Sequence, residues 1–195
     1  GRLEHVYTTA MRGFSARMPA EAAARIAAMN PQIAFYEADG VVRAIAPGGK
    51  AGPPGGGGST SPEVIPSGVA RVGGPIDGTG LTAWVIDTGI DLDHPDLNVD
   101  AARGANFNGR SAPDDRNGHG THVAGTIGAL GNNNLGVTGV NWDVSIMALR
   151  AGDEGGLPDD AIMNAFAYAC ANGADIVNGS FGSSEMSPAI RDAVL

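Results

Sequence analysis

Two histidines lie three residues apart in the stretch Arg-Asn-Gly-His-Gly-Thr-His-Val-Ala-Gly-Thr-Ile, residues 116–127, where a helix is expected to begin. A carboxylate, Asp87, follows the apolar run 81–86, and sites in open parallel sheets gather at the carboxyl ends of strands. A carboxylate that accepts the Nδ1 proton of an imidazole fixes its tautomer, so Nε2 can take a proton from a nucleophile. Asp87 and His119 are therefore predicted to be two members of a catalytic triad.

A zinc site is the alternative, because two histidines on one helical face and a carboxylate can form a three-ligand set. The zinc-protease motif spaces its histidines four apart and places Glu beside the first. Here His119 and His122 are three apart, and glycine follows the first. The spacing favours catalysis over zinc, and the small residues Gly120, Ala124 and Gly125 are expected to let the helix lie close against a sheet.

The elements that must position these residues alternate between strand and helix, which favours an α/β fold with a parallel sheet flanked by helices. Apolar runs predict strands at 81–86, 144–149 and 174–177. Helices are predicted at 160–171 and from Ser187-Pro188 onward. The first of these helices is expected to bury one face made of Ile162, Phe166, Ala169 and Cys170.

The first 46 residues have a strand and helix pattern of their own. The stretch 6–18 is strand-like, a helix is predicted at 20–29 after Pro19, and a second strand is predicted at 33–37, leading to Val41-Val42. So short a segment has a marginal core. We expect it to lean on another part of the protein.

A linker rich in glycine and proline, residues 47–65, separates this part from residues 66–195. Up to Lys50 the chain has six basic and four acidic residues, a balance of +2, and beyond it six basic and seventeen acidic residues, a balance of −11. The opposite charges indicate either attraction between the two parts or a chance imbalance.

Composition excludes several classes of partner and of covalent structure. The net charge of −9 argues against nucleic-acid binding, which depends on clustered Lys and Arg. A membrane partner is not expected either, because no stretch approaches the ~20 apolar residues of a membrane helix. A single cysteine, Cys170, excludes an internal disulfide.

Two ordered blocks, residues 83–97 (AWVIDTGIDLDHPDL) and residues 117–126 (NGHGTHVAGT), resemble the Asp and His blocks of the subtilisin-like serine proteases, peptidase family S8. The resemblance implies a subtilisin-like α/β domain whose carboxyl-terminal part is absent. In such a domain Asp87 orients the imidazole, His119 is the base, and His122 packs. It also implies polypeptide substrates and secretion.

The stretch 13–39 resembles, more loosely, the inhibitory propeptide of the same family, of the I9 type. This resemblance implies that residues 1–46 are a partial ferredoxin-like α+β propeptide domain. The propeptide would then be an intramolecular partner of the protease part.

The resemblance also implies a groove for an extended peptide, formed by Ser180-Phe181-Gly182 on one side and by Gly155-Gly156-Leu157 on the other. Main-chain pairing explains why side chains there can be small. For the glycines, an ordinary turn is the alternative.

The stretch 130–137 resembles the family's structural calcium loop, in which carbonyl oxygens, an Asn side chain and the Asp of His-Pro-Asp-Leu surround Ca²⁺. A polar surface turn is the alternative. The residues implied as ligands are Asp96, Leu130, Asn132, Asn133, Leu135 and Val137.

The family's nucleophilic serine lies in a Gly-Thr-Ser-Met-Ala type of block, and no such block occurs in the 195 residues. We therefore expect a precursor of a serine endopeptidase whose Asp and His are present and whose Ser lies outside this sequence. The 195 residues alone are expected to be inactive and poorly soluble. A noncatalytic protease inhibitor or folding-chaperone module is the alternative.

Overall fold

A computed structural model describes residues 1–9, 11–44, 63–109 and 111–195. The predicted linker lies outside the described residues, except for its last three positions. No helix in the described ranges is long and apolar enough to cross a membrane. The elements are β1 (Arg2–Tyr7), β2 (Gly13–Arg17), α1 (Ala20–Met29), β3 (Val41–Ala44), α2 (Ser67–Arg71), β4 (Ile76–Asp77), β5 (Thr82–Asp87), β6 (Ala105–Asn106), α3 (His119–Gly128), β7 (Asn141–Trp142), β8 (Ser145–Arg150), β9 (Leu157–Pro158), α4 (Asp159–Ala171), β10 (Val177–Gly179), β11 (Phe181–Gly182) and α5 (Pro188–Val194).

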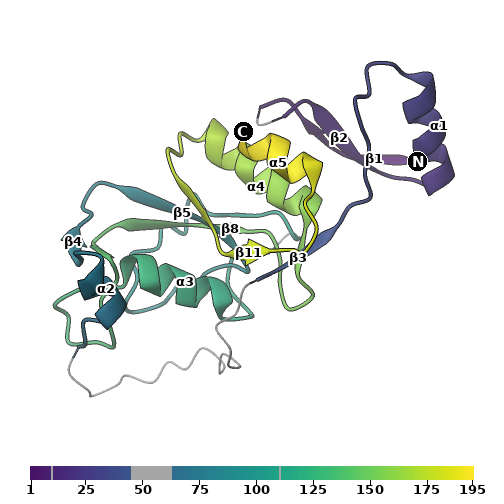
Figure 1. Ribbon diagram of the computed structural model, residues 1–195. Helices are drawn as coiled ribbons and strands as arrows, with labels where there is room; N and C mark the ends of the chain where they lie inside the picture. Colours follow the sequence, from purple (N-terminus) through teal and green to yellow (C-terminus); the bar gives the residue numbers. More distant parts are fainter. Residues whose placement is uncertain (10, 45–62, 110) are drawn as a thin grey trace.

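The centre of the protein is a parallel sheet with the strand order β10-β5-β8-β6. Helix α3 covers one face, and helices α4 and α5 lie on the other (Figure 1). The predicted parallel sheet flanked by helices is confirmed.

The alternation of side chains along β5 and β8 builds a separate core on each face of the sheet. Trp84 and Ile86 pack with the buried residues of α4, whereas Val85 packs with Ala124 of α3. Asp87 is two residues beyond Val85 and therefore falls on the same face as α3. Because side chains alternate between the two faces along a strand, Asp87 lies on the same face as Val85 and contacts the start of α3 at His119.

Four local predictions were wrong. Residues 33–37 are not a strand, and the extended stretch pairs only at β3. Strand β10 begins at Val177, three residues later than expected. Cys170 is exposed, because α4 turns Ile162, Ala165 and Ala169 toward the sheet. A Cβ on Gly125 would meet nothing within 4 Å, so close packing of α3 depends on Gly120 and Gly128.

The amino-terminal part buries little by itself. Strands β1 and β2 form an antiparallel pair, and helix α1 has no fully buried residue. The buried side chains described in residues 1–44 are Tyr7 and Val42, and both pack against the rest of the protein. Tyr7 contacts a cluster on α4 and α5 made of Met163, Ala189 and Ala193.

We predict that Ile146→Ala lowers the free energy of unfolding by about 2 to 5 kcal/mol, because the side chain is 0% exposed between the sheet and α3. The matched control is Ile176→Ala, whose side chain is 80% exposed, with an expected change within about 0.5 kcal/mol. Denaturant unfolding measures both. Equal losses would contradict the assignment of this face as a core.

Candidate active site

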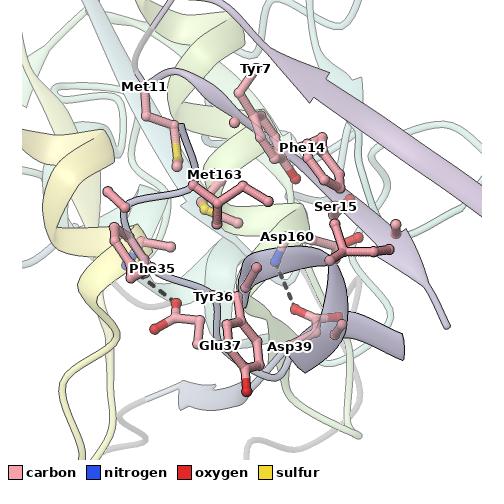
Figure 2. A pocket seen from close by; sticks show the side chains of 18 of the residues that line it. Tyr7, Met11, Phe14, Ser15, Phe35, Tyr36, Glu37, Asp39, Asp160 and Met163 are labelled. Carbon is pink, nitrogen blue, oxygen red and sulfur yellow. Dashed lines mark hydrogen bonds between the residues drawn. The ribbon is translucent and has the colours of Figure 1, made fainter. Parts of the chain in front are cut away.

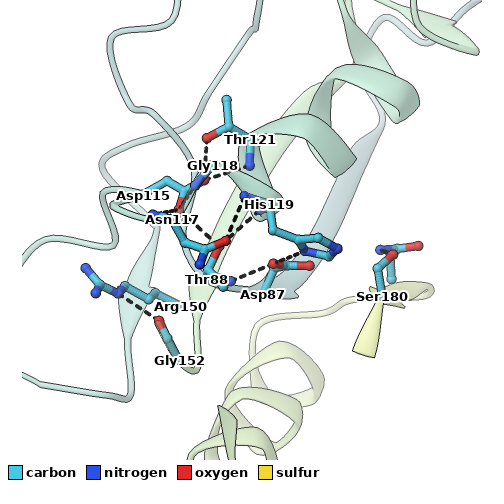
Figure 3. A network of polar contacts seen from close by, with 12 residues as sticks. Asp87, Thr88, Asp115, Asn117, Gly118, His119, Thr121, Arg150, Gly152 and Ser180 are labelled. Atoms are coloured by element: carbon cyan, nitrogen blue, oxygen red, sulfur yellow. Dashed lines mark hydrogen bonds and ion pairs between the residues drawn. The ribbon is translucent and has the colours of Figure 1, made fainter. Parts of the chain in front are cut away.

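Asp87 and His119 form a buried pair at the carboxyl end of β5. Asp87 is the last residue of that strand, and His119 is the first residue of α3. The His119 Nδ1 lies 2.7 Å from the Asp87 Oδ1, and the two residues are 1% (Asp87) and 5% (His119) exposed (Figure 3). The structure thus brings together the two residues predicted to belong to a triad.

The surroundings of Asp87 act on its pKa in opposite directions. Burial raises the pKa of Asp87, while hydrogen bonds from His119 and from the backbone N–H of Thr88 act to lower it. The Thr88 N–H donates to the same Oδ1 at 2.7 Å. A carboxylate held in this way fixes the ring's orientation and stabilises an imidazolium.

The start of α3 approaches the end of β5 very closely, and two glycines permit this. A Cβ on Gly120 would clash with the carbonyl oxygen of Gly89 and lie 3.1 Å from the Asp87 Cβ. Gly118 precedes the helix with φ 95°, a left-handed conformation that favours glycine. The motif Gly-His-Gly therefore places the imidazole against the carboxylate.

Residues that the sequence reasoning missed surround this pair. Asp115 is buried and accepts hydrogen bonds from the backbone N–H groups of Asn117 at 2.9 Å, Gly118 at 3.0 Å and Thr121 at 3.0 Å. Although burial acts to raise it, these hydrogen bonds and one from the Thr121 hydroxyl hold the pKa of Asp115 below its ordinary value. The signal in the sequence was an Asp placed two and three residues before backbone N–H groups that lead into a helix.

His122 does not pack as expected. It is exposed, and its carbonyl oxygen accepts a hydrogen bond from the Thr126 hydroxyl. The buried residues of α3 include His119, Gly120 and Ala124, so His122 lies on the face turned away from the sheet. Within the described ranges, no group of three or more His, Cys, Asp or Glu side chains could hold a metal ion.

The predicted groove residues border strand β3. Phe181 and Gly182 pair with it antiparallel on one side, and Ser180 accepts a hydrogen bond from the Asn178 amide at 3.0 Å. On the other side the pairing residues are Leu157–Pro158.

Gly155 and Gly156 lie in the turn just before β9 rather than in the strand itself. A Cβ on Gly156 would lie 2.7 Å from the Val42 carbonyl oxygen, so this turn lies directly against β3.

Two of the predicted calcium residues, Leu130 through its backbone N–H and Asn133 through its side chain, contact Asp96. Its Oδ1 accepts a hydrogen bond from the Asn133 side chain at 2.5 Å, and burial together with the nearby Glu63 raises the pKa of Asp96. Glu63, which the sequence reasoning did not single out, accepts the backbone N–H groups of residues 132–134. The loop therefore turns three backbone N–H groups toward Glu63 and one side-chain amide nitrogen toward Asp96.

Comparison with known proteins places this chain in a family. The profile described as the Subtilase family matches residues 78–194. An alkaline protease of Alkalihalobacillus alcalophilus is 35% identical over 174 residues, covering 85% of this chain and 40% of the relative. Subtilisin Savinase of Lederbergia lenta is 40% identical over 138 residues, covering 67% of this chain and 50% of the relative.

Solved structures agree with the sequence relatives. The S41 psychrophilic protease superposes with a TM-score of 0.60 at 32% identity, covering 69% of this chain and 49% of the other. A psychrophilic subtilisin-like protease, Apa1 from the Antarctic psychrotroph Pseudoalteromonas sp. AS-11, gives a TM-score of 0.53 at 31% identity over 68% of this chain and 33% of the other. The chain spans 40 to 50% of the length of the two curated relatives. The paired Asp87 and His119 and these similarities lead to one conclusion: the chain belongs to the subtilase family.

Proposed function

We propose that this chain belongs to a secreted serine endopeptidase precursor that cleaves polypeptides by acyl transfer. The observation that carries the proposal is the buried 2.7 Å contact between His119 and Asp87 in a member of the subtilase family. The nucleophilic serine and the oxyanion donors would come from sequence outside these 195 residues. The residues present would prepare the base.

In this function the two residues divide the proton chemistry between them. His119 would take the proton of the serine hydroxyl as the serine attacks the carbonyl carbon, and would then give it to the leaving amine. Asp87 would keep the Nδ1 proton in place and stabilise the positive ring.

Strand β3 supports the second part of the proposal, that the amino-terminal part is an inhibitory propeptide. It lies between β11 and β9 and pairs antiparallel with both, in the manner of an extended peptide added to a sheet. Val42 is buried beside Leu157, whereas Val41 is exposed, as alternation along a bound strand requires. A substrate would compete for the same backbone groups.

Two acidic residues hold the amino-terminal part on the helices beyond the groove. The Glu37 carboxylate accepts hydrogen bonds from the Ser187 hydroxyl at 2.7 Å and the Ala189 N–H at 3.2 Å, at the start of α5. The Asp39 carboxylate accepts the Asp160 N–H at 3.0 Å, at the start of α4 (Figure 2). These contacts satisfy backbone donors that a helix leaves unpaired. The helix N-termini act to lower the pKa of Asp39, but its burial outweighs them and the pKa is raised.

A noncatalytic inhibitor or folding module is the second candidate, and the same pairing of β3 supports it. It gives no reason, however, for burying an imidazole against a carboxylate at the end of β5. Both activities can belong to one precursor, in which the first part covers the groove of the second.

We also propose a structural Ca²⁺ at Asp96. Its buried carboxylate and the carboxylate of Glu63 would supply negative charge, with oxygen atoms of Leu130, Asn132, Asn133, Leu135 and Val137 as the further predicted ligands. The ion would tie the loop to the segment at Glu63, and the Asn133 amide would have to turn its oxygen toward the ion, because its nitrogen now donates to Asp96.

We predict that His119→Ala abolishes catalysis in a protein extended through the downstream serine block, by about 10⁴-fold or more in kcat, because the serine loses its base. Labelling by a serine-directed fluorophosphonate should fall in parallel. The matched control is His122→Ala on the exposed face of the same helix, with kcat within about twofold of the parent. Single-site labelling and casein cleavage by the 195 residues alone would contradict the proposal of an external serine.

We predict that docking of the amino-terminal part weakens as the pH rises. Burial raises the docked pKa of Asp39 and of Asp159, and the two carboxylates repel one another, with Asp160 and Glu37 adding to the repulsion. The docked state therefore binds more protons than the separated parts, so docking is strongest below the ordinary value of 3.8 and is lost progressively as the pH rises through the raised docked pKa values.

Calorimetric titration of the cleaved amino-terminal part into the remaining protein between pH 4 and 8 measures this effect. Asp159→Asn should tighten docking at pH 8 and flatten the pH dependence, because the variant has no charge to bury at that position. The exposed Asp175→Asn serves as the control and should leave both unchanged. Tighter docking at pH 8 than at pH 4 in the parent protein would refute the prediction.

We predict that excess Ca²⁺ raises the melting temperature relative to a chelator, because a ligand that binds the folded state stabilises it by mass action. Asp96→Asn should remove most of this difference, and the exposed Asp93→Asn, three residues earlier, should not. An equal melting temperature with Ca²⁺ and with chelator would leave the loop as a polar turn held by Glu63.

A further inference from the structure

We infer that the Thr88 hydroxyl and the Asp115 carboxylate are positioning groups that hold the ring of His119 against Asp87. The inference rests on the proposed function, in which His119 is the base. The hydrogen bonds of these two side chains go to backbone and hydroxyl groups around His119, not to its ring, so they are positioning residues and not catalytic ones. They fix the backbone from which the ring projects.

Asp115 collects the polar groups of the turn that leads into α3. Its Oδ1 accepts the N–H groups of Asn117 and Gly118 and the Thr88 hydroxyl at 3.0 Å, and its Oδ2 accepts the N–H and the hydroxyl of Thr121. The hydroxyl of Thr121 is the closest of these donors, at 2.6 Å. One carboxylate, 6% exposed, therefore fixes the backbone on both sides of His119.

Thr88 connects this network to the other member of the pair. Its hydroxyl donates to Asp115 and accepts the Gly120 N–H at 3.1 Å, while its own N–H donates to the Asp87 carboxylate at 2.7 Å. The residue after Asp87 thus binds the residue after His119. Rotation of the helix start relative to the strand end would break these bonds together.

The loop that carries Asp115 is itself held in place. Ile90 exchanges backbone hydrogen bonds with this loop, donating to the Pro113 carbonyl and accepting from the Asp115 N–H. The buried Arg150 guanidinium donates to the Asp114 carbonyl at 2.9 Å and to the Gly152 carbonyl at 3.1 Å. Asp115 is therefore a fixed reference for the helix start.

The remainder of α3 is held by apolar packing of Ala124 and by Gly128 against the sheet, not by this network. Loss of the Thr88 hydroxyl should therefore leave the helix docked and free only its first turn. Misplacement of a catalytic group by about 1 Å can cost about 10²-fold in rate. If Thr88 positions His119, its loss lowers the rate of catalysis. If Thr88 is purely structural, its loss lowers only the stability of the fold.

The first test needs no activity. In the protein extended through the serine block and labelled with ¹⁵N-histidine, the Nδ1 proton of His119 should give a low-field resonance, assigned by its absence in His119→Ala. We expect Thr88→Val and Asp115→Asn to shift this resonance upfield or lose it to exchange, and Thr88→Ser to restore it. Thr126→Val, which removes an exposed hydroxyl from the same helix, is the control and should leave it in place.

The second test uses the protein extended through the serine block and a peptide substrate. Thr88→Val should lower kcat about 10- to 100-fold with KM within about twofold, and Thr88→Ser should recover most of the loss. If Asp115→Asn does not fold, the Thr88 variants still decide the matter.

A lower melting temperature with an unchanged resonance and unchanged kcat in Thr88→Val would overturn the inference, as would equal losses in Thr88→Val and Thr88→Ser. An unlabelled, inactive parent protein whose resonance still responds to Thr88→Val would refute the proposed function and leave the positioning role standing.

Discussion

The burial of one carboxylate, Asp87, imposes a condition that the surrounding structure has to meet. A buried charge is costly unless hydrogen bonds compensate it, and Asp87 receives them from His119 and from its own neighbour, Thr88. Both donors depend on the close contact of α3 with the end of β5, which only a residue without a side chain at position 120 allows. The apolar layers on the two faces of the sheet keep strand and helix at that separation.

The same sheet organises the amino-terminal part. Strand β5 of this sheet ends at Asp87. Its two neighbours in the sheet, β8 and β10, are followed along the chain by β9 and β11, and these two strands border β3. Because β3 is bound mainly through its backbone and through Val42, the first part can attach firmly although it has little core of its own. A hollow of about 470 Å³ is lined mostly by residues 7–39, and Asp159, Asp160 and Met163 of α4 and Ala189 of α5 complete it (Figure 2).

The sequence was sufficient for whatever depends on periodicity or on a local motif. The strand ending at Asp87, the helix after Pro19 and the pairing of His119 with Asp87 were all predictable. Contacts between distant segments were not. Residues 33–37 look like a strand but find no partner strand, and the donors gathered by Asp115 come from turns whose meeting depends on the whole fold. The exposure of His122 likewise depends on which face of α3 meets the sheet.

Glu37 and Asp39 bind mostly main-chain N–H groups, and this has an evolutionary consequence. Every non-proline residue supplies the same N–H group, so substitutions in α4 and α5 cannot easily remove the receiving surface. The covering segment can then diverge widely while it keeps two acidic side chains separated by one residue. Exchange of such segments between diverged relatives should therefore succeed more often than their overall identity suggests.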